Sequence, residues 1–93
     1  MIDEKYFSTI DLNLMVTFMI IYREQNLTRA ASMLQVKQPA VSGALARLRA
    51  IFGDELFVRK ARGMRPTEHA HKIAKTLDPA IQKIQSLITP PNN

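Results

Sequence analysis

Two short helical patterns, at about 29–34 and 38–52, are separated only by a tight turn at Leu34 to Lys37. Thr28 can cap the first helix, because its side-chain oxygen can accept a hydrogen bond from the free amides of the first turn. Pro39 falls in the first turn of the second helix, where its missing amide hydrogen costs little. Two helices joined by so short a turn predict a helix-turn-helix.

The second helix of this pair has two unlike faces. One is an apolar stripe in steps of three and four residues, formed by Val41, Leu45, Leu48 and Phe52 and widened by Ala44 and Ile51. The other is small, polar and uncrowded, with Pro39, Ser42, Gly43, Ala46 and Arg49. We therefore expect the stripe to face the core and the second face to point outward.

That outward face is suited to reading DNA bases. The major groove of B-DNA admits one helix, and short hydrogen-bonding side chains near the helix N-terminus reach the base edges. Gln38, Pro39 and Ser42 are the expected base contacts, since Gln can pair bidentately with adenine and a proline ring can touch a thymine methyl. The alternative is that Gln38 and Ser42 only satisfy local backbone groups.

The net charge of +5 is concentrated in one part of the chain. Between residues 29 and 65, eight Lys and Arg residues oppose two acidic residues, so this segment carries +6 and the rest of the chain −1. Such a block is typical of a polyanion site, although an ordinary solvated basic face has the same composition. The expected phosphate contacts around the outward face are Arg29, Lys37, Arg47 and Arg49.

A small hairpin is expected after the second helix. Gly53 suits the left-handed residue that ends a helix, and strand-forming residues follow from Glu55 to Arg59. Lys60 to Gly63 then predicts a turn, and Met64 to Pro66 a return strand. Its basic residues Arg59, Lys60 and Arg62 predict a wing that follows the DNA backbone or enters the minor groove, with a solvated basic turn as the alternative.

A first helix is expected from Leu12 to Gln25, capped by the carboxylate of Asp11. Its centre, Leu14 to Ile21, is apolar nearly all round, so it needs two packing partners. Residues 1–10 form an N-terminal arm, whose apolar residues could pack on the body: Tyr6, Phe7 and Ile10.

Thr67 can cap a last helix that runs to about residue 88. A long apolar stripe on a terminal helix is typical of a dimer interface, and the expected dimer contacts are Ile73, Leu77, Ile81, Ile84, Leu87 and Ile88. Pro79 removes one backbone bond, so either the helix kinks there or Asp78 caps a second segment. Residues 89–93 form a tail or the start of a hinge.

Several classes of function lack the residues they need. The chain has no cysteine, and His69 and His71, two apart on a helix, point about 200° apart and cannot chelate one metal ion. The sequence shows no glycine-rich phosphate loop, no nucleophile elbow and no paired carboxylates on one face. We expect no enzymatic activity, no metal and no cofactor. We also expect a cytoplasmic protein, because there is no signal-peptide pattern and no apolar stretch near the ~18 residues of a membrane span.

Five ordered blocks of sequence resemble the LysR-type transcriptional regulators: D-L-N-L at 11–14, L-T-R-A-A at 27–31, Q-P-A-V-S at 38–42, L-A-R-L-R at 45–49 and G-D-E-L-F-V-R at 53–59. The stretches E-Q-N-L-T-R-A-A at 24–31 and R-G-M-R-P-T at 62–67 are most similar to the LeuO and nodulation-regulator branch. The resemblance implies a winged helix-turn-helix followed by a dimerising linker helix. It also implies base contacts from Gln38, Pro39 and Ser42, phosphate contacts around Thr28 and Arg29, and a wing contact from Arg59.

This chain departs from the family pattern at the recognition helix, residues 38–52. Lys37 stands where the family commonly has a Ser or Thr cap, so a side-chain acceptor is lost and a phosphate-seeking charge is gained. Gly43 stands where many members have a long polar residue. It cannot read a base, and a glycine there costs the helix about 0.5–1 kcal/mol.

Together these features predict a mainly α fold: an arm at 1–10, a winged helix-turn-helix with a two-stranded wing at 11–66, and a linker helix at 67–88. We expect sequence-specific binding of double-stranded DNA at an inverted repeat, by a homodimer or a higher oligomer, without membrane contact. A small-molecule effector would act only through a C-terminal domain outside this chain. The alternative function is a winged-helix module whose basic face binds an acidic protein partner.

Overall fold

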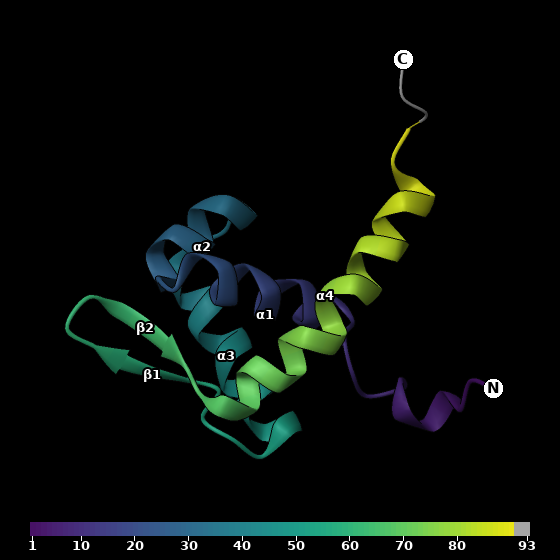
Figure 1. Ribbon diagram of the computed structural model, residues 1–93, viewed down its shortest axis with the longest axis horizontal. Helices are drawn as coiled ribbons and strands as arrows, with labels where there is room; N and C mark the ends of the chain where they lie inside the picture. Colours follow the sequence, from purple (N-terminus) through teal and green to yellow (C-terminus); the bar gives the residue numbers. More distant parts are fainter. Residues whose placement is uncertain (91–93) are drawn as a thin grey trace.

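The computed structural model describes residues 1–90, which form four α-helices and one antiparallel hairpin (Figure 1). In chain order the elements are a short 3₁₀ turn η1 (Glu4–Tyr6), α1 (Asn13–Glu24), α2 (Leu27–Leu34), α3 (Gln38–Phe52), β1 (Phe57–Lys60), β2 (Gly63–Pro66) and α4 (Glu68–Ile88). The hairpin projects from one side of the body formed by α1, α2 and α3, and the far half of α4 leaves on the other side (Figure 1). The predicted mainly α winged helix-turn-helix is therefore confirmed.

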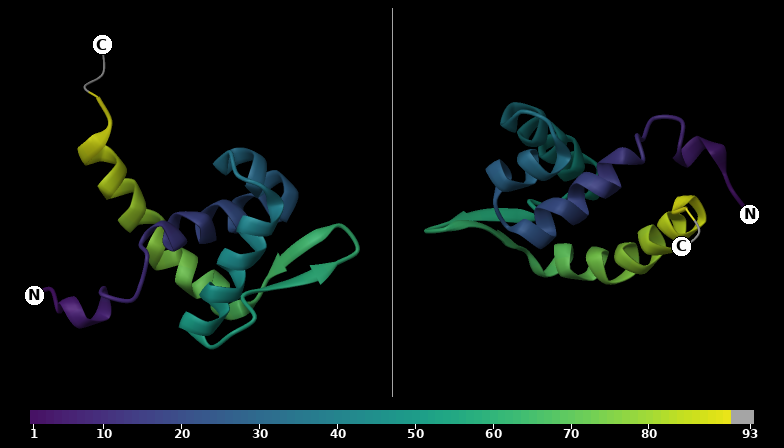
Figure 2. Two further views of the ribbon diagram at one scale, coloured as in Figure 1. Left: turned by 180° about the vertical axis from the view of Figure 1, so that it is seen from behind. Right: turned by 90° about the horizontal axis from the view of Figure 1, so that it is seen from above.

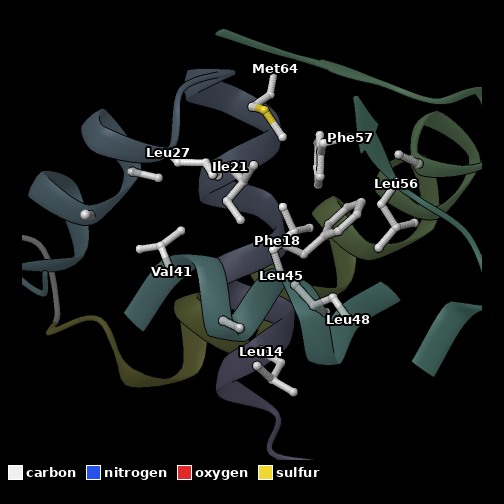
Figure 3. Close-up of a cluster of buried hydrophobic side chains, with 14 of the residues drawn as sticks. Leu14, Phe18, Ile21, Leu27, Val41, Leu45, Leu48, Leu56, Phe57 and Met64 are labelled. Atoms are coloured by element: carbon white, nitrogen blue, oxygen red, sulfur yellow. The ribbon is translucent and has the colours of Figure 1, made fainter. Parts of the chain in front are cut away.

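α1 lies at the centre of the hydrophobic core. Its Phe18 is fully buried, and the Phe18 ring centroid lies 5.4 Å from that of Phe57 (Figure 3) and 6.3 Å from that of Phe52. One side chain thus joins α1 to the hairpin and to the end of α3. α1 also packs against α2, α3 and α4. The sequence predicted two packing partners for this apolar helix, and the structure provides three.

The first two helices begin at positions other than those expected. Asn26, not Thr28, caps α2, because its backbone is extended and its Oδ1 accepts a hydrogen bond of 2.9 Å from the amide of Arg29. The expected cap at Thr28 is wrong, since that residue already lies in the first turn. α1 begins at Asn13, one residue later than expected, although the Asp11 carboxylate does accept from the Asn13 amide at 2.9 Å.

α3 presents its apolar stripe to the core as predicted. Val41, Leu45 and Leu48 are buried together with Ala44, and Phe52 is half-buried. Ile51 was expected to widen this stripe but is 38% exposed, because it lies at the margin of the stripe in the last turn. Lys37 occupies the cap position of α3 and makes no side-chain capping bond, as its side chain has no acceptor.

The N-terminal arm does not pack on the body as the sequence suggested. Tyr6 is 65% exposed and Phe7 47% exposed, and Ile10 is half-buried. Asp3 caps η1 by accepting from the Lys5 amide, so this segment folds on itself and extends away from the helices (Figure 2). Two exposed aromatic rings are the result.

The hairpin is fixed to the end of α1 through a close backbone approach. Gln25 has a left-handed φ of 53°, which ends α1 and leaves its carbonyl free to accept a 2.9 Å hydrogen bond from the amide of Met64. Gly63 allows this contact: its φ is +92°, and a Cβ there would overlap the Gln25 carbonyl oxygen. The start of β2 therefore requires glycine for both its conformation and its space.

A network of hydrogen bonds joins the end of α3, the hairpin and α4. Leu56 has a φ of 65° at the centre of a γ-turn, in which the Phe57 amide donates to the Glu55 carbonyl at 2.7 Å. Oδ2 of Asp54 accepts 2.8 Å bonds from the Leu56 amide and from the Thr67 hydroxyl. The same Thr67 oxygen accepts from the amide of Ala70 at 3.1 Å, which confirms Thr67 as the cap of α4.

α4 is one helix through Pro79 rather than two segments (Figure 2). Ala70 and Ala74 are buried in the core, whereas the helix beyond Leu77 is mostly exposed. Of the expected tail at 89–93, residues 91–93 lie outside the described part of the chain. Within residues 1–90, no helix combines the length and the apolar composition that crossing a membrane requires.

The Gly63 contact predicts a specific loss of stability. Gly63→Ala should lower the free energy of unfolding by about 1–3 kcal/mol, because alanine is strained at this φ and its methyl group displaces the Gln25 carbonyl. Gly43→Ala is the matched control, since no atom lies within 4 Å of a Cβ there and the residue is helical; it should stabilise by about 0.5–1 kcal/mol. Urea unfolding followed by circular dichroism measures both, and two variants of equal stability would contradict the prediction.

Asp54 predicts a pH-dependent contribution to stability. The Leu56 amide and then the Thr67 hydroxyl lower the pKa of Asp54, with a smaller lowering from His69, against an opposing effect of burial. A carboxylate whose pKa is lower in the folded state stabilises the fold above the unfolded-state pKa and loses that effect as the pH falls through the folded-state pKa. Urea unfolding should therefore separate wild type from Asp54→Asn most clearly at neutral pH, and the gap should close below about pH 4. A gap of constant size from pH 7 to pH 3 would be the contrary result.

Candidate nucleic-acid interface

The first turns of α3 carry the three residues expected to contact bases. Pro39 is exposed, and Gln38 and Ser42 are half-buried. Nε2 of Gln38 donates a 3.0 Å hydrogen bond to Oγ of Ser42, one turn along the helix. These two side chains are therefore bonded to each other, and the alternative that they satisfy local backbone groups has no hydrogen bond to support it among the described residues. Gly43 follows with open space where a side chain would begin.

Exposed cations surround this surface. Lys37 is exposed at the cap of α3, and Arg47 is exposed within that helix. The uncharged Thr28 is exposed in the first turn of α2. The side chain of Arg29 is 67% exposed and its Nη2 lies 3.4 Å from Oε1 of Glu24. The Glu24 side chain is only 11% exposed, so the carboxylate is largely covered while the Arg29 guanidinium remains accessible to a phosphate.

Arg49 does not belong to this set of accessible cations. Its Nε donates to the carbonyl of Glu55 and its Nη2 to the carbonyl of Phe57, both at 2.8 Å. It is half-buried and braces the chain between α3 and β1. Two of its five N–H donors are thus used within the chain, a structural role that no sequence pattern reveals, and the expected phosphate contact from Arg49 stays a prediction.

The pairing of the hairpin divides the basic residues of the wing between its two faces. Arg59 lies directly opposite the buried Met64, so it shares the face that turns toward α3. Lys60 and Arg65 alternate with them and lie on the other face, while Arg62 lies in the turn. A cleft of about 250 Å³ separates this wing from α3 and is lined by Leu27, Ser42, Leu45, Arg49, Arg59 and Met64.

Both histidines are exposed, as expected, but they have structural neighbours that the sequence did not reveal. The Tyr22 hydroxyl lies 2.7 Å from Nδ1 of His71, and the two rings meet edge to face. The His69 ring lies edge to face with the ring of Phe52, at the end of α3. His71 thus ties α1 to α4. Among residues 1–90, no group of three or more His, Cys, Asp or Glu side chains is placed to hold a metal ion.

The residues expected to form a dimer interface divide along α4. Ile73 and Leu77 pack against the core and, with Met15 and Phe52, line an apolar groove of about 440 Å³. Ile81 is half-buried, and beyond it Ile84, Leu87 and Ile88 are 55%, 83% and 76% exposed. Large apolar side chains therefore remain uncovered on the far half of α4.

Comparisons with known proteins agree with this arrangement. Residues 12–71 match the family model described as bacterial regulatory helix-turn-helix protein, lysR family. The chain is 48% identical to the HTH-type transcriptional regulator LeuO of Escherichia coli K12 over 77 residues, which is 83% of this chain and 24% of that protein. It is 39% identical to SyrM 1 of Sinorhizobium fredii over 83 residues, which is 89% of this chain and 25% of that protein. The chain thus spans about a quarter of the length of these relatives.

Solved structures show the same fold. The probable transcriptional regulator PA0477 from Pseudomonas aeruginosa is 36% identical, with a TM-score of 0.82 over 88% of this chain and 28% of that one. A BenM_DBD/catB site 1 DNA complex matches with a TM-score of 0.78 at 22% identity, over 86% of this chain and 90% of that one. The matched family consists of regulators, in agreement with the expectation that this is not an enzyme. The chain belongs to the lysR family of bacterial regulatory helix-turn-helix proteins.

Proposed function

We propose that this chain is the DNA-binding domain of a dimeric bacterial transcriptional regulator and binds double-stranded DNA in a sequence-specific way. The observation that carries the proposal is the outward face of α3, where polar and small residues are surrounded by exposed cations on α2, α3 and the wing. Related domains of the same fold have been solved as complexes with DNA.

In this proposal α3 enters the major groove. Gln38 and Pro39 contact the base edges, and Ser42 belongs to the same surface, because all three residues lie in the first turns of α3. The phosphates on either side are bound by Thr28, Arg29, Lys37 and Arg47. On the wing, Arg59 and Arg62 contact the DNA backbone or minor groove, whereas Lys60 contributes only from the outer face of the hairpin.

In the proposed dimer, each copy of the chain contributes one α3 helix to DNA binding. The exposed apolar residues of the far half of α4 support a helix-to-helix interface between two copies of the chain. A two-fold axis there would place two α3 helices on an inverted repeat, and the dimer geometry would set the spacing of the half-sites. We propose that this domain works in the cytoplasm, and that any small-molecule effector acts through a further domain of a longer protein.

Titration with duplex DNA at several salt concentrations tests the function. With five cations directly at the DNA, namely Arg29, Lys37, Arg47, Arg59 and Arg62, the slope of log K against log salt should be about −4.5 per protomer, and Arg47→Ala should reduce its magnitude by about one. Lys83→Ala on α4 is the control and should leave the slope unchanged. An absence of binding, or a slope near zero, would favour the alternative of an acidic protein partner.

Replacement of an exposed residue on α4 tests the dimer. Ile84→Glu should weaken dimerisation by at least about 2 kcal/mol, because a carboxylate would be buried without a partner at the interface. Ser86→Glu introduces the same charge about 200° away around the helix and should leave the dimer intact. Sedimentation equilibrium measures both, and a dimer unaffected by Ile84→Glu would refute this interface.

A further inference from the structure

Gln38 and Ser42 form a bonded pair at the start of the recognition helix. Gln38 is the first residue of α3 and Ser42 lies four residues on, so their side chains are neighbours on one helix face. The bond from Nε2 of Gln38 to Oγ of Ser42 is 3.0 Å long. Both side chains are half-buried, so part of each is turned away from solvent.

The bond leaves Gln38 with the groups that one base requires. A glutamine amide has two N–H donors on Nε2 and one acceptor oxygen, and Ser42 takes one of the donors. One donor and the acceptor remain. Adenine presents one acceptor, N7, and one donor group on N6 in the major groove, so the remaining pair of groups matches adenine.

Ser42 itself lies on the side of α3 that borders the wing. It lines the cleft between α3 and the wing, together with Leu45, Arg49 and Met64, and Gln38 is not among the residues that line this cleft. Pro39 and Gln38, by contrast, lie in the first turn of the helix. Ser42 is thus placed on the flank of the helix, with its oxygen directed to the Gln38 amide.

We infer that Ser42 is a positioning residue, which fixes the amide of Gln38 for bidentate pairing with an adenine in the operator. This inference rests on the proposed function and assigns the base specificity of that site to Gln38 acting through Ser42. A free glutamine side chain has several rotatable bonds, and restraining it before binding reduces the conformational entropy lost on contact with the base. Ser42 therefore affects recognition without touching a base.

The experiment uses a duplex selected from a random pool by the wild-type chain, with each base pair then replaced in turn. Four proteins are compared: wild type, Gln38→Ala, Ser42→Ala and the double variant, with Ser86→Ala as a serine control remote from α3. Thermal unfolding monitors the fold, and Ser42→Ala should remain folded because alanine has the higher helix propensity. Ser42→Thr retains the hydroxyl and should restore the wild-type preference.

The expected result is an effect confined to one base pair. Wild type should prefer A·T there by between about fivefold and 150-fold, the usual range for a bidentate contact. Gln38→Ala and Ser42→Ala should each reduce the preference at that same base pair, and the double variant should lose no more than Gln38→Ala alone.

Three outcomes would overturn the inference. A change of preference at a different base pair in Ser42→Ala would make Ser42 an independent base reader. Additive losses in the double variant, or no loss in Ser42→Ala, would show that Gln38 does not depend on Ser42. A wild-type chain that binds all duplexes equally would instead refute the proposed function, and this inference with it.

Discussion

The two hydrogen bonds that Arg49 donates to the carbonyls of Glu55 and Phe57 determine how the reading helix and the wing are arranged. Between Arg49 and Phe57 the chain passes through left-handed conformations at Gly53 and Leu56. A non-glycine residue in such a conformation costs about 1–3 kcal/mol. Complete burial of the Leu56 side chain returns a similar amount, about 1.5–3 kcal/mol. A strained connection therefore persists because the Arg49 bonds and the core both hold it, and the wing keeps a fixed orientation relative to α3.

Most of the fold could be predicted from the sequence, because its signals are local. The apolar steps Val41, Leu45 and Leu48 define the buried face of α3, and Thr67 is followed at once by the helix that it caps. The predicted start of α2 was wrong because Asn26 and Thr28 are both good capping residues. Only the structure shows that Asn26 has the extended backbone of a cap residue. The arm was misjudged because apolar residues near a terminus carry no information about whether a surface is available to them.

The candidate site was predicted less completely, since its organisation depends on contacts between distant residues. Nothing in the sequence separates Arg47, which is exposed, from Arg49, two of whose five N–H donors are bonded to backbone carbonyls six and eight residues later. Which basic residues lie on which face of the wing depends on the register that pairs Arg59 with Met64. A shift of one residue would move these side chains to the opposite face. The Gln38–Ser42 bond follows from helical spacing, but the choice between pairing with each other and reading bases separately requires coordinates.

Gly43 has a consequence for how this domain can change over evolutionary time. Substitutions at Val41, Leu45 and Leu48 are constrained by the core, whereas a Cβ at position 43, one residue after Ser42, would meet no atom outside the neighbouring backbone within 4 Å. A new side chain there begins in empty space and improves the intrinsic preference for helix. Under the proposed function, a mutation at this position would add a side chain beside the bases without a loss of folding stability. In a lineage of regulators, such a site allows the repertoire of target sequences to diverge while the protein scaffold stays the same.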